Sequence, residues 1–115
     1  MTVNCPMLQR LVMRRLITTP LSLICPQLTH LDLVACKLSD ASLRQCAVSA
    51  PLLTRLSLAG CHQLTDETLR QVAASCSRLT TLNVSHCPLL TIPENFEPRN
   101  LKQLWMVRPP SALTT

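Results

Sequence analysis

Residues 53–76, LTRLSLAGCHQLTDETLRQVAASC, carry a strand signal, a turn and a helix signal in that order. The stretch opens with the spacing Leu-x-x-Leu-x-Leu, whose last two leucines alternate as they do in a half-buried strand. Thr65 provides a hydroxyl for a helix N-cap, and Asp66 and Glu67 place negative charge at the positive end of that helix. An apolar stripe at helical spacing follows at Leu69, Val72 and Ala73. The unit therefore predicts a short strand, a turn and a helix of about ten residues that leads back to the next strand.

The leucine spacing of this unit recurs along the whole chain. Copies begin at Leu28, Leu53 and Leu79, and weaker copies that end in methionine begin at Leu8 and Leu101. The starts at 8, 28, 53, 79 and 101 are separated by 20, 25, 26 and 22 residues. Similarity at an almost constant period is typical of a repeat protein. We therefore expect a single domain over residues 1–115 with about five repeats.

Six of the seven cysteines keep the same register as the leucines. One column lies eight residues after the first leucine of a repeat and consists of Cys36, Cys61 and Cys87. A second column, expected where each helix ends, lies three residues before a first leucine and consists of Cys5, Cys25 and Cys76. Position within the repeat explains these cysteines better than a disulfide framework does, and the odd total agrees. We expect small, buried, reduced thiols and hence a cytoplasmic or nuclear protein.

Stacking of such units predicts the fold. No unit can bury its own leucines, but neighbouring units can stack them into one continuous column. The strands would then pair as a parallel sheet on the concave side, and the helices would cover the convex side. The expected fold is α/β, a right-handed leucine-rich-repeat solenoid in the shape of a short horseshoe. A hydrophobic content of 47% is sufficient for such a core.

The central unit closely resembles the cysteine-containing leucine-rich repeat of the F-box/leucine-rich-repeat proteins. The likeness covers residues 28–90 well, although Leu38 comes one residue early. Only the strands match in residues 5–27 and 91–106, and Pro93 interrupts the last helix pattern. In that family such repeats form the substrate-recognition surface of a cullin-based ubiquitin ligase, joined to an F-box that docks an adaptor subunit. The resemblance thus implies a substrate-recognition module.

The F-box of that family has no counterpart in this sequence. Only 27 residues precede Leu28, and they already carry the repeat spacing. The chain opens at Cys5, the end-of-helix position of a repeat whose earlier part is absent. We therefore expect a domain that is incomplete at its N-terminus. An adaptor subunit is expected as a partner only if an F-box lies outside this chain.

The strand residues on either side of the middle leucine should point away from the core, because side chains alternate along a strand. One set precedes the middle leucine: Arg10, His30, Arg55, Thr81 and Gln103. The other set follows it: Val12, Asp32, Ser57, Asn83 and Trp105. A parallel sheet lines these side chains up, and tryptophan and arginine most often dominate interface energy. We predict a protein partner on this concave face, bound through Arg10, His30, Asp32, Arg55, Asn83 and Trp105.

Two other functions stay open on the sequence. A pI of about 9.1 and basic residues near both ends favour a nucleic-acid-binding repeat protein. Those residues are Arg10, Arg14, Arg15, Lys102 and Arg108. Against this alternative, only Phe96 and Trp105 could stack on bases, and no basic stripe crosses the middle repeats. The second alternative is a structural scaffold with a solvated face and no ubiquitin-ligase role.

Catalysis, metal binding and membrane insertion are not expected. His30, His62 and His86 are spread over three repeats, and the sequence pairs none of them with an acid, so that no activated nucleophile is indicated. The neighbours Cys61-His62 and His86-Cys87 lack the close Cys-x2-4-Cys or His-x3-5-His pairs of zinc sites. No uncharged apolar stretch approaches the ~18 residues of a membrane span. We expect no enzyme, no cofactor and no membrane partner.

Overall fold

Two layers make up the structure, a computed structural model that describes residues 2–17, 21–92, 96 and 100–106. Among these residues, five strands form one parallel sheet in the order β2-β4-β5-β6-β7. They are β2 (Arg10–Val12), β4 (His30–Asp32), β5 (Arg55–Ser57), β6 (Thr81–Asn83) and β7 (Gln103–Trp105). The expected parallel sheet is therefore present, with one strand for each leucine unit.

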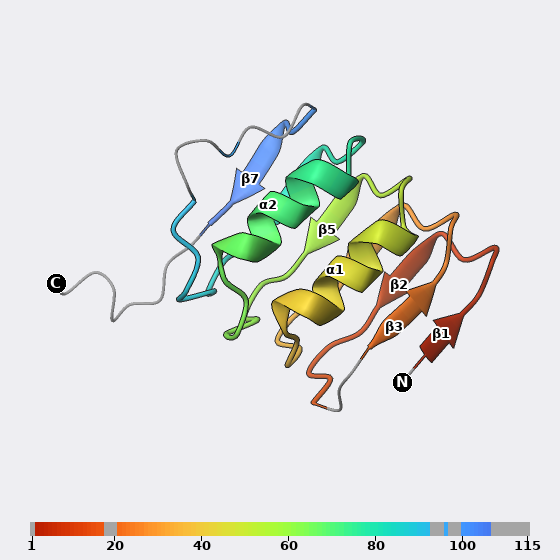
Figure 1. The fold of residues 1–115 in the computed structure, drawn as a ribbon, viewed down its shortest axis with the longest axis horizontal. Coiled ribbons are helices and arrows are strands. Elements are labelled where there is room, and N and C mark those ends of the chain that lie inside the picture. Colours follow the sequence, from red (N-terminus) through yellow and green to blue (C-terminus); the bar gives the residue numbers. More distant parts are fainter. Residues whose placement is uncertain (1, 18–20, 93–95, 97–99, 107–115) are drawn as a thin grey trace, which may run out of the picture.

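The second layer covers one side of this sheet, and we call it the convex layer. It consists of β1 (Thr2–Asn4), β3 (Ser22–Ile24), α1 (Asp40–Ser49) and α2 (Asp66–Ser75). These elements lie side by side in chain order: β1 pairs with β3 in parallel, β3 packs against α1, and α1 packs against α2 (Figure 1). We call the opposite side of the five-stranded sheet the concave face.

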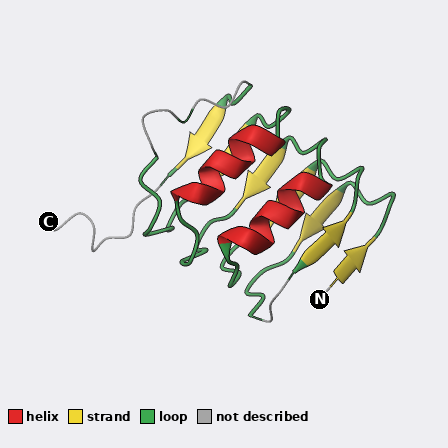
Figure 2. Ribbon diagram, in the orientation of Figure 1, coloured by secondary structure: helices red, strands yellow, loops and turns green. Residues whose placement is uncertain are grey.

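Strands, not helices, form the N-terminal part of the convex layer (Figure 2). The expectation that Cys5 and Cys25 end helices is wrong, because they follow β1 and β3. Only 20 residues separate the first two repeat starts, against 25 and 26 in the repeats that contain α1 and α2. A strand rises about 3.3 Å per residue and a helix about 1.5 Å, so a shorter segment must be extended to cross the same distance. Pro93, which was expected to interrupt a later helix, lies outside the described residues.

Gln45 joins the two kinds of convex element. Its side-chain Oε1 accepts a hydrogen bond from the Leu23 N–H (2.9 Å), and its Nε2 donates to the Leu23 carbonyl oxygen (3.0 Å). The side-chain amide of Gln45 therefore makes the same two hydrogen bonds to β3 that the backbone of a neighbouring strand would make. The polar edge of β3 is satisfied at the point where strands give way to helices.

The leucine columns form the core between the two layers. In the three central repeats every position of the spacing is buried, namely Leu28, Leu31, Leu33, Leu53, Leu56, Leu58, Leu79, Leu82 and Val84. Toward the two ends the same positions are less buried: Leu11, Met13 and Leu101 are partly buried, and Leu104 is exposed. The central repeats therefore supply most of the buried apolar area, and with it most of the hydrophobic stabilisation.

Each cysteine of the first column bonds to the repeat before it. The thiols of Cys36, Cys61 and Cys87 donate to the carbonyl oxygens of Met13, Leu33 and Leu58, at 3.2, 3.1 and 3.1 Å. The acceptors hold the last leucine position of the preceding repeat. These small buried donors therefore link neighbouring repeats where the chain leaves the sheet.

A second set of links lies at the other end of the strands and was not expected from the sequence. Thr29, Thr54 and Thr80 each follow the first leucine of a repeat. Their hydroxyls donate to the carbonyl oxygens of Gln9, Thr29 and Thr54, each at 3.1 Å. The central strands are therefore tied to their predecessors at both ends, which keeps the side chains of the concave face in fixed rows.

Thiol reactivity should follow burial. All seven cysteines are free, and Cys5 is the exposed one. Burial raises the pKa of Cys46 and Cys61 to about 12 and that of Cys76 to about 11, so these thiols stay protonated near pH 8. Alkylation of the native protein should therefore modify Cys5 alone in the time that the unfolded protein gains seven labels, as counted by mass spectrometry. Rapid labelling of Cys61 in the native protein would contradict the structure.

The turn after each of four strands contains one left-handed residue. Arg15, Ala35, Gly60 and His86 have φ angles of 56°, 56°, 75° and 60° and share one position, seven residues after the first leucine. A Cβ placed on Gly60 would meet backbone atoms of Ala35 at 3.5 Å, an ordinary van der Waals contact. Successive turns therefore stack closely, and three of the four carry the strain that an L side chain has in this conformation.

Opposite substitutions at two of these turns should have opposite effects. Ala35→Gly should stabilise the protein by about 0.5 kcal/mol, because relief of the left-handed strain outweighs the added freedom of the unfolded chain. Gly60→Ala should destabilise it by about 1 kcal/mol, since the space exists but the backbone conformation is unfavourable. Urea unfolding followed by circular dichroism measures both changes. Effects of the same sign would show that these turns are not left-handed.

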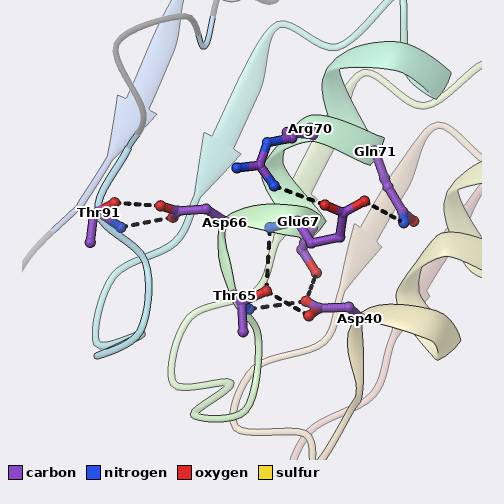
Figure 3. A network of polar contacts seen from close by, with 8 residues as sticks. Asp40, Thr65, Asp66, Glu67, Arg70, Gln71 and Thr91 are labelled. Carbon is purple, nitrogen blue, oxygen red and sulfur yellow. Dashed lines mark hydrogen bonds and ion pairs between the residues drawn. The ribbon is translucent and has the colours of Figure 1, made fainter.

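The first acidic residue of each helix reaches the next repeat (Figure 3). Asp40 accepts hydrogen bonds from the Thr65 N–H (3.0 Å), the Thr65 hydroxyl (2.6 Å) and the Thr68 hydroxyl. Asp66 binds the N–H of Thr91 (2.9 Å) and the hydroxyl of the same residue. Thr65 is itself the N-cap of α2. These acids were expected only to face the positive end of their own helix, and they also fix the start of the next unit.

The Asp40 contacts should make stability depend on acid pH. Burial tends to raise the pKa of Asp40, but hydrogen bonds from Thr65 and Thr68 outweigh it and hold the pKa below the ordinary value of 3.8. The stabilisation is therefore complete above that value and is lost as the pH falls through the lower folded-state pKa. Asp40→Asn should cost about 1 kcal/mol at neutral pH and should flatten the acid decline in the free energy of unfolding. An unchanged acid decline in the variant would exclude Asp40 as its source.

Candidate functional site

Two parallel rows of side chains cross the concave face. The strand register places the residue before each middle leucine beside its counterpart on the next strand, and the same holds for the residue after it. We call the first set row one: Arg10, His30, Arg55, Thr81 and Gln103. We call the second set row two: Val12, Asp32, Ser57, Asn83 and Trp105. Neighbouring members of a row belong to strands about 4.8 Å apart.

All six site residues predicted from the sequence lie in these rows. Row one contains Arg10, His30 and Arg55, and row two contains Asp32, Asn83 and Trp105. Together they border a hollow of about 430 Å³. The middle leucines of the first three strands also line the hollow, namely Leu11, Leu31 and Leu56. The leucine spacing assigns these residues to the core, and their part in the hollow was not expected from the sequence.

Row one carries its positive charges at Arg10 and Arg55, with His30 between them. His30 is half-buried between the exposed Arg10 on β2 and the exposed Arg55 on β5. Burial lowers the pKa of His30, and the positive charges of Arg10 and Arg55 lower it further. The remaining two members, Thr81 and Gln103, are uncharged. The charge of the row is therefore concentrated at the end that contains β2, β4 and β5.

Thr29 holds one side of the His30 ring. Thr29 Oγ1 and His30 Nδ1 lie 2.8 Å apart, within hydrogen-bond distance. The same hydroxyl lies 3.1 Å from the Gln9 carbonyl oxygen on the preceding repeat. The Nδ1 side of the ring is therefore occupied by a contact within the protein.

Two members of row two are held by the backbone of their own turns. Asp32 Oδ1 accepts a hydrogen bond from the Val34 N–H at 3.3 Å, and Asn83 Oδ1 accepts one from the Ser85 N–H at 3.0 Å. Asp32 Oδ2 lies 3.6 Å from the guanidinium of Arg14. The one carboxylate of row two thus already has a positive partner in the chain, a contact that the sequence pattern did not reveal.

Exposed apolar side chains mark the two ends of row two. Val12 on β2 is 61% exposed, and Trp105 on β7 is 54% exposed. An exposed tryptophan on a mostly polar sheet face offers a partner a large contact area and loses little rotamer freedom on binding. The concave face therefore combines a positive row with apolar positions at opposite ends.

The basic residues do not form a stripe across the described part of the sheet. Arg10 lies at the β2 end and Lys102 directly precedes β7 at the other end, while Arg108 lies outside the described residues. Phe96 is partly buried and packs against the core, which leaves Trp105 as the aromatic residue available for stacking. Nucleic-acid platforms combine a basic groove with several stacking aromatic groups, and the described face has a single one.

The cysteine and histidine neighbours differ in exposure. Cys61 and Cys87 are buried, whereas His62 and His86 are exposed. Within the described ranges, no three His, Cys, Asp or Glu side chains come together as a potential metal site. No helix in the same part of the chain is long and apolar enough to cross a membrane. The structure thus uses the two cysteines for packing and for hydrogen bonds between repeats.

Comparison with known families agrees with the repeat architecture. A search of curated proteins found no match to the chain. A family model described as Leucine Rich Repeat matches residues 78–98. This segment begins one residue before Leu79 and contains β6, so it corresponds to the fourth leucine unit. Leucine-rich repeats are typically non-enzymatic modules that mediate protein–protein interaction. The comparison therefore identifies a leucine-rich repeat in residues 78–98 of this chain.

Proposed function

We propose that this chain is a protein–protein interaction module that holds its partner on the concave face. The observation that carries the proposal is the hollow of about 430 Å³ between rows one and two, bordered by Arg10, His30, Asp32, Arg55, Asn83 and Trp105. Arginine and tryptophan most often dominate interface energy. Paired strands position them here, so little freedom is lost when a partner binds.

We further propose that the module acts as the substrate-recognition repeats of a cullin-based ubiquitin ligase do. Support comes from the cysteine column, because its buried thiols at Cys36, Cys61 and Cys87 make the contacts between repeats. An adaptor subunit would join only through an F-box outside this chain. The free thiols support a reducing compartment, cytoplasmic or nuclear. We take residues 1–115 as one right-handed solenoid domain of about five repeats.

Row one also favours one alternative, a basic repeat protein that binds nucleic acid. Its three basic groups could meet phosphates, and such contacts are strongly weakened by salt. Asp32 in the neighbouring row opposes this alternative, because a carboxylate repels phosphate. The third candidate function is a structural scaffold with no partner on this face. Substitutions on the concave and convex sides would then have equally small effects on binding.

Substitutions on the two sides of the molecule test the proposal. Trp105→Ala and Arg55→Ala should each weaken partner binding by about 2 kcal/mol, because each removes an exposed anchor from the concave face. Arg70→Ala is the matched control, since this side chain is exposed on α2 and pairs with Glu67 at 2.8 Å. It should change partner binding by less than about 0.5 kcal/mol. The partner is captured from cell extract by the wild-type chain, identified by mass spectrometry, purified and titrated by calorimetry.

Thermal unfolding must first show that the three variants are folded. Equal losses of affinity in the concave and convex variants would overturn the proposal. A ligand that is lost on nuclease treatment, and whose affinity falls linearly with the logarithm of salt concentration, would identify the nucleic-acid alternative instead.

A further inference from the structure

We propose that row one binds anionic side chains, carboxylate or phosphorylated, of a partner peptide segment that crosses the strands of the concave face. This inference rests on the proposed function and narrows it, because it names the chemistry of the segment that the module holds. Three basic groups in register on neighbouring strands carry it: Arg10, His30 and Arg55. The guanidinium groups of the two arginines can each bind a carboxylate or phosphate through two parallel hydrogen bonds.

Acidic residues are sorted to the other side of the molecule. Among the described residues, Asp40, Asp66 and Glu67 lie in the convex helices, and Asp32 is the acidic residue of the concave strands. Asp32 already lies 3.6 Å from the Arg14 guanidinium. The positive charge of row one is therefore not offset by any acidic side chain of that row, and an anionic ligand would supply the missing charge.

The spacing of row one fits a peptide in the polyproline II conformation laid across the strands. Two strand-to-strand steps separate β2 from β5, so Arg10 and Arg55 stand about 10 Å apart along the row, with His30 between them. A peptide in the polyproline II conformation has three residues per turn and advances about 3.1 Å per residue, so residues three positions apart lie on one face about 9 Å apart. Two acidic residues separated by three positions would therefore face the two arginines.

The β7 end of the concave face indicates which residue type suits a third position of the peptide. Two further strand-to-strand steps lead from β5 to β7, which carries the 54% exposed Trp105. The same spacing of about 10 Å then places a peptide residue, three positions after the second acid, over Gln103 of row one, next to Trp105 two residues further along β7. An apolar side chain suits this position, because burial against the ring removes apolar surface of both groups from water.

The observations favour a peptide over a nucleic acid. A nucleic acid presents phosphates at every nucleotide, but only the β2, β4 and β5 members of row one are basic. Thr81 and Gln103 continue the row without charge, and Asp32 lies in the neighbouring row. A peptide can match this sequence of basic, neutral and apolar positions, whereas a uniform phosphate backbone cannot.

His30 should make the binding of an acidic peptide depend on pH. The charged groups that face its ring are Arg10 on β2, Arg55 on β5 and Asp32 on its own strand. Because burial and the two arginines hold the pKa of His30 below 6.5, the free ring is mostly neutral at pH 7.5. When the ring gains a proton in acid, row one acquires a third positive charge, so affinity should rise as the pH falls below 6.5 for as long as the glutamates stay ionised. His30→Gln should remove this rise and keep the affinity seen at pH 7.5.

The chain's single tryptophan makes the test direct. Trp105 lies on the same face, and its fluorescence reports a ligand that reaches β7. The first probe is a peptide of about ten residues with two glutamates three positions apart and a leucine three positions after the second. Matched probes replace the glutamates with glutamines or with phosphoserines, and a single-stranded oligonucleotide of similar length is the fourth probe. All are titrated at low ionic strength, where exposed charges are least screened.

The glutamate and phosphoserine peptides should both bind about tenfold more tightly than the glutamine peptide. Arg10→Gln and Arg55→Gln should each weaken the glutamate peptide severalfold and leave the glutamine peptide unchanged. Arg44→Gln is the matched control, because Arg44 is an exposed arginine of α1 in the convex layer, and it should change no affinity. Arg55→Glu should reverse the preference toward a peptide with lysines in place of the glutamates, which a merely destabilised protein would not do.

Equal affinity for the glutamate and glutamine peptides, or no binding of either, would overturn the inference. Tighter binding of the oligonucleotide, with equal losses for every arginine removed, would assign row one to nucleic acid. The two proposals can fail separately. If the captured partner still depends on Trp105 and Arg55 while peptide charge has no effect, only the anionic ligand is wrong. If the partner is indifferent to all concave substitutions, the proposed function itself fails.

Discussion

Unbroken register between parallel strands is the constraint on which the other features of this molecule depend. Leu31, Leu56 and Leu82 are paired directly across β4, β5 and β6. Because side chains alternate along a strand, this pairing sends the leucines to one side and both polar rows to the other. A slip of one residue would expose the leucines and bury the charged groups. The core and the concave face are therefore two consequences of one pairing, and the threonine and cysteine links at the strand ends preserve it.

The convex layer is under a weaker constraint, because it only has to cover the core and return the chain to the next strand. Two helices do this in the middle repeats, and β1 and β3 do it at the N-terminal end. Gln45 allows the change from one kind of element to the other by hydrogen bonding to the edge of β3. Variation in repeat length is therefore absorbed in this layer, and the spacing of the concave rows is unaffected.

The acidic and basic side chains are also divided between the convex layer and the concave face. Asp40 and Asp66 bind the N-cap threonine and its equivalent in the following repeats, so their charge serves the stacking of convex elements. The arginines of row one have no comparable structural contact with an acid in the described residues, and they stand exposed beside His30. A charge pattern that stabilises the repeats on one side thus leaves the arginines of row one exposed on the other side.

The sequence by itself determined the five strands of the concave sheet, their leucines and the membership of both rows, because a period of two along each strand is a local property. It also identified the cysteine column from spacing alone. Only the tertiary structure decided that β1 and β3 replace helices, that Thr29 fixes the His30 ring, and that Asp32 meets Arg14. These features depend on distances between different repeats and on the number of residues available to cross the convex layer. Spacing within one repeat does not encode such distances, whereas stacking sets them for every repeat at once.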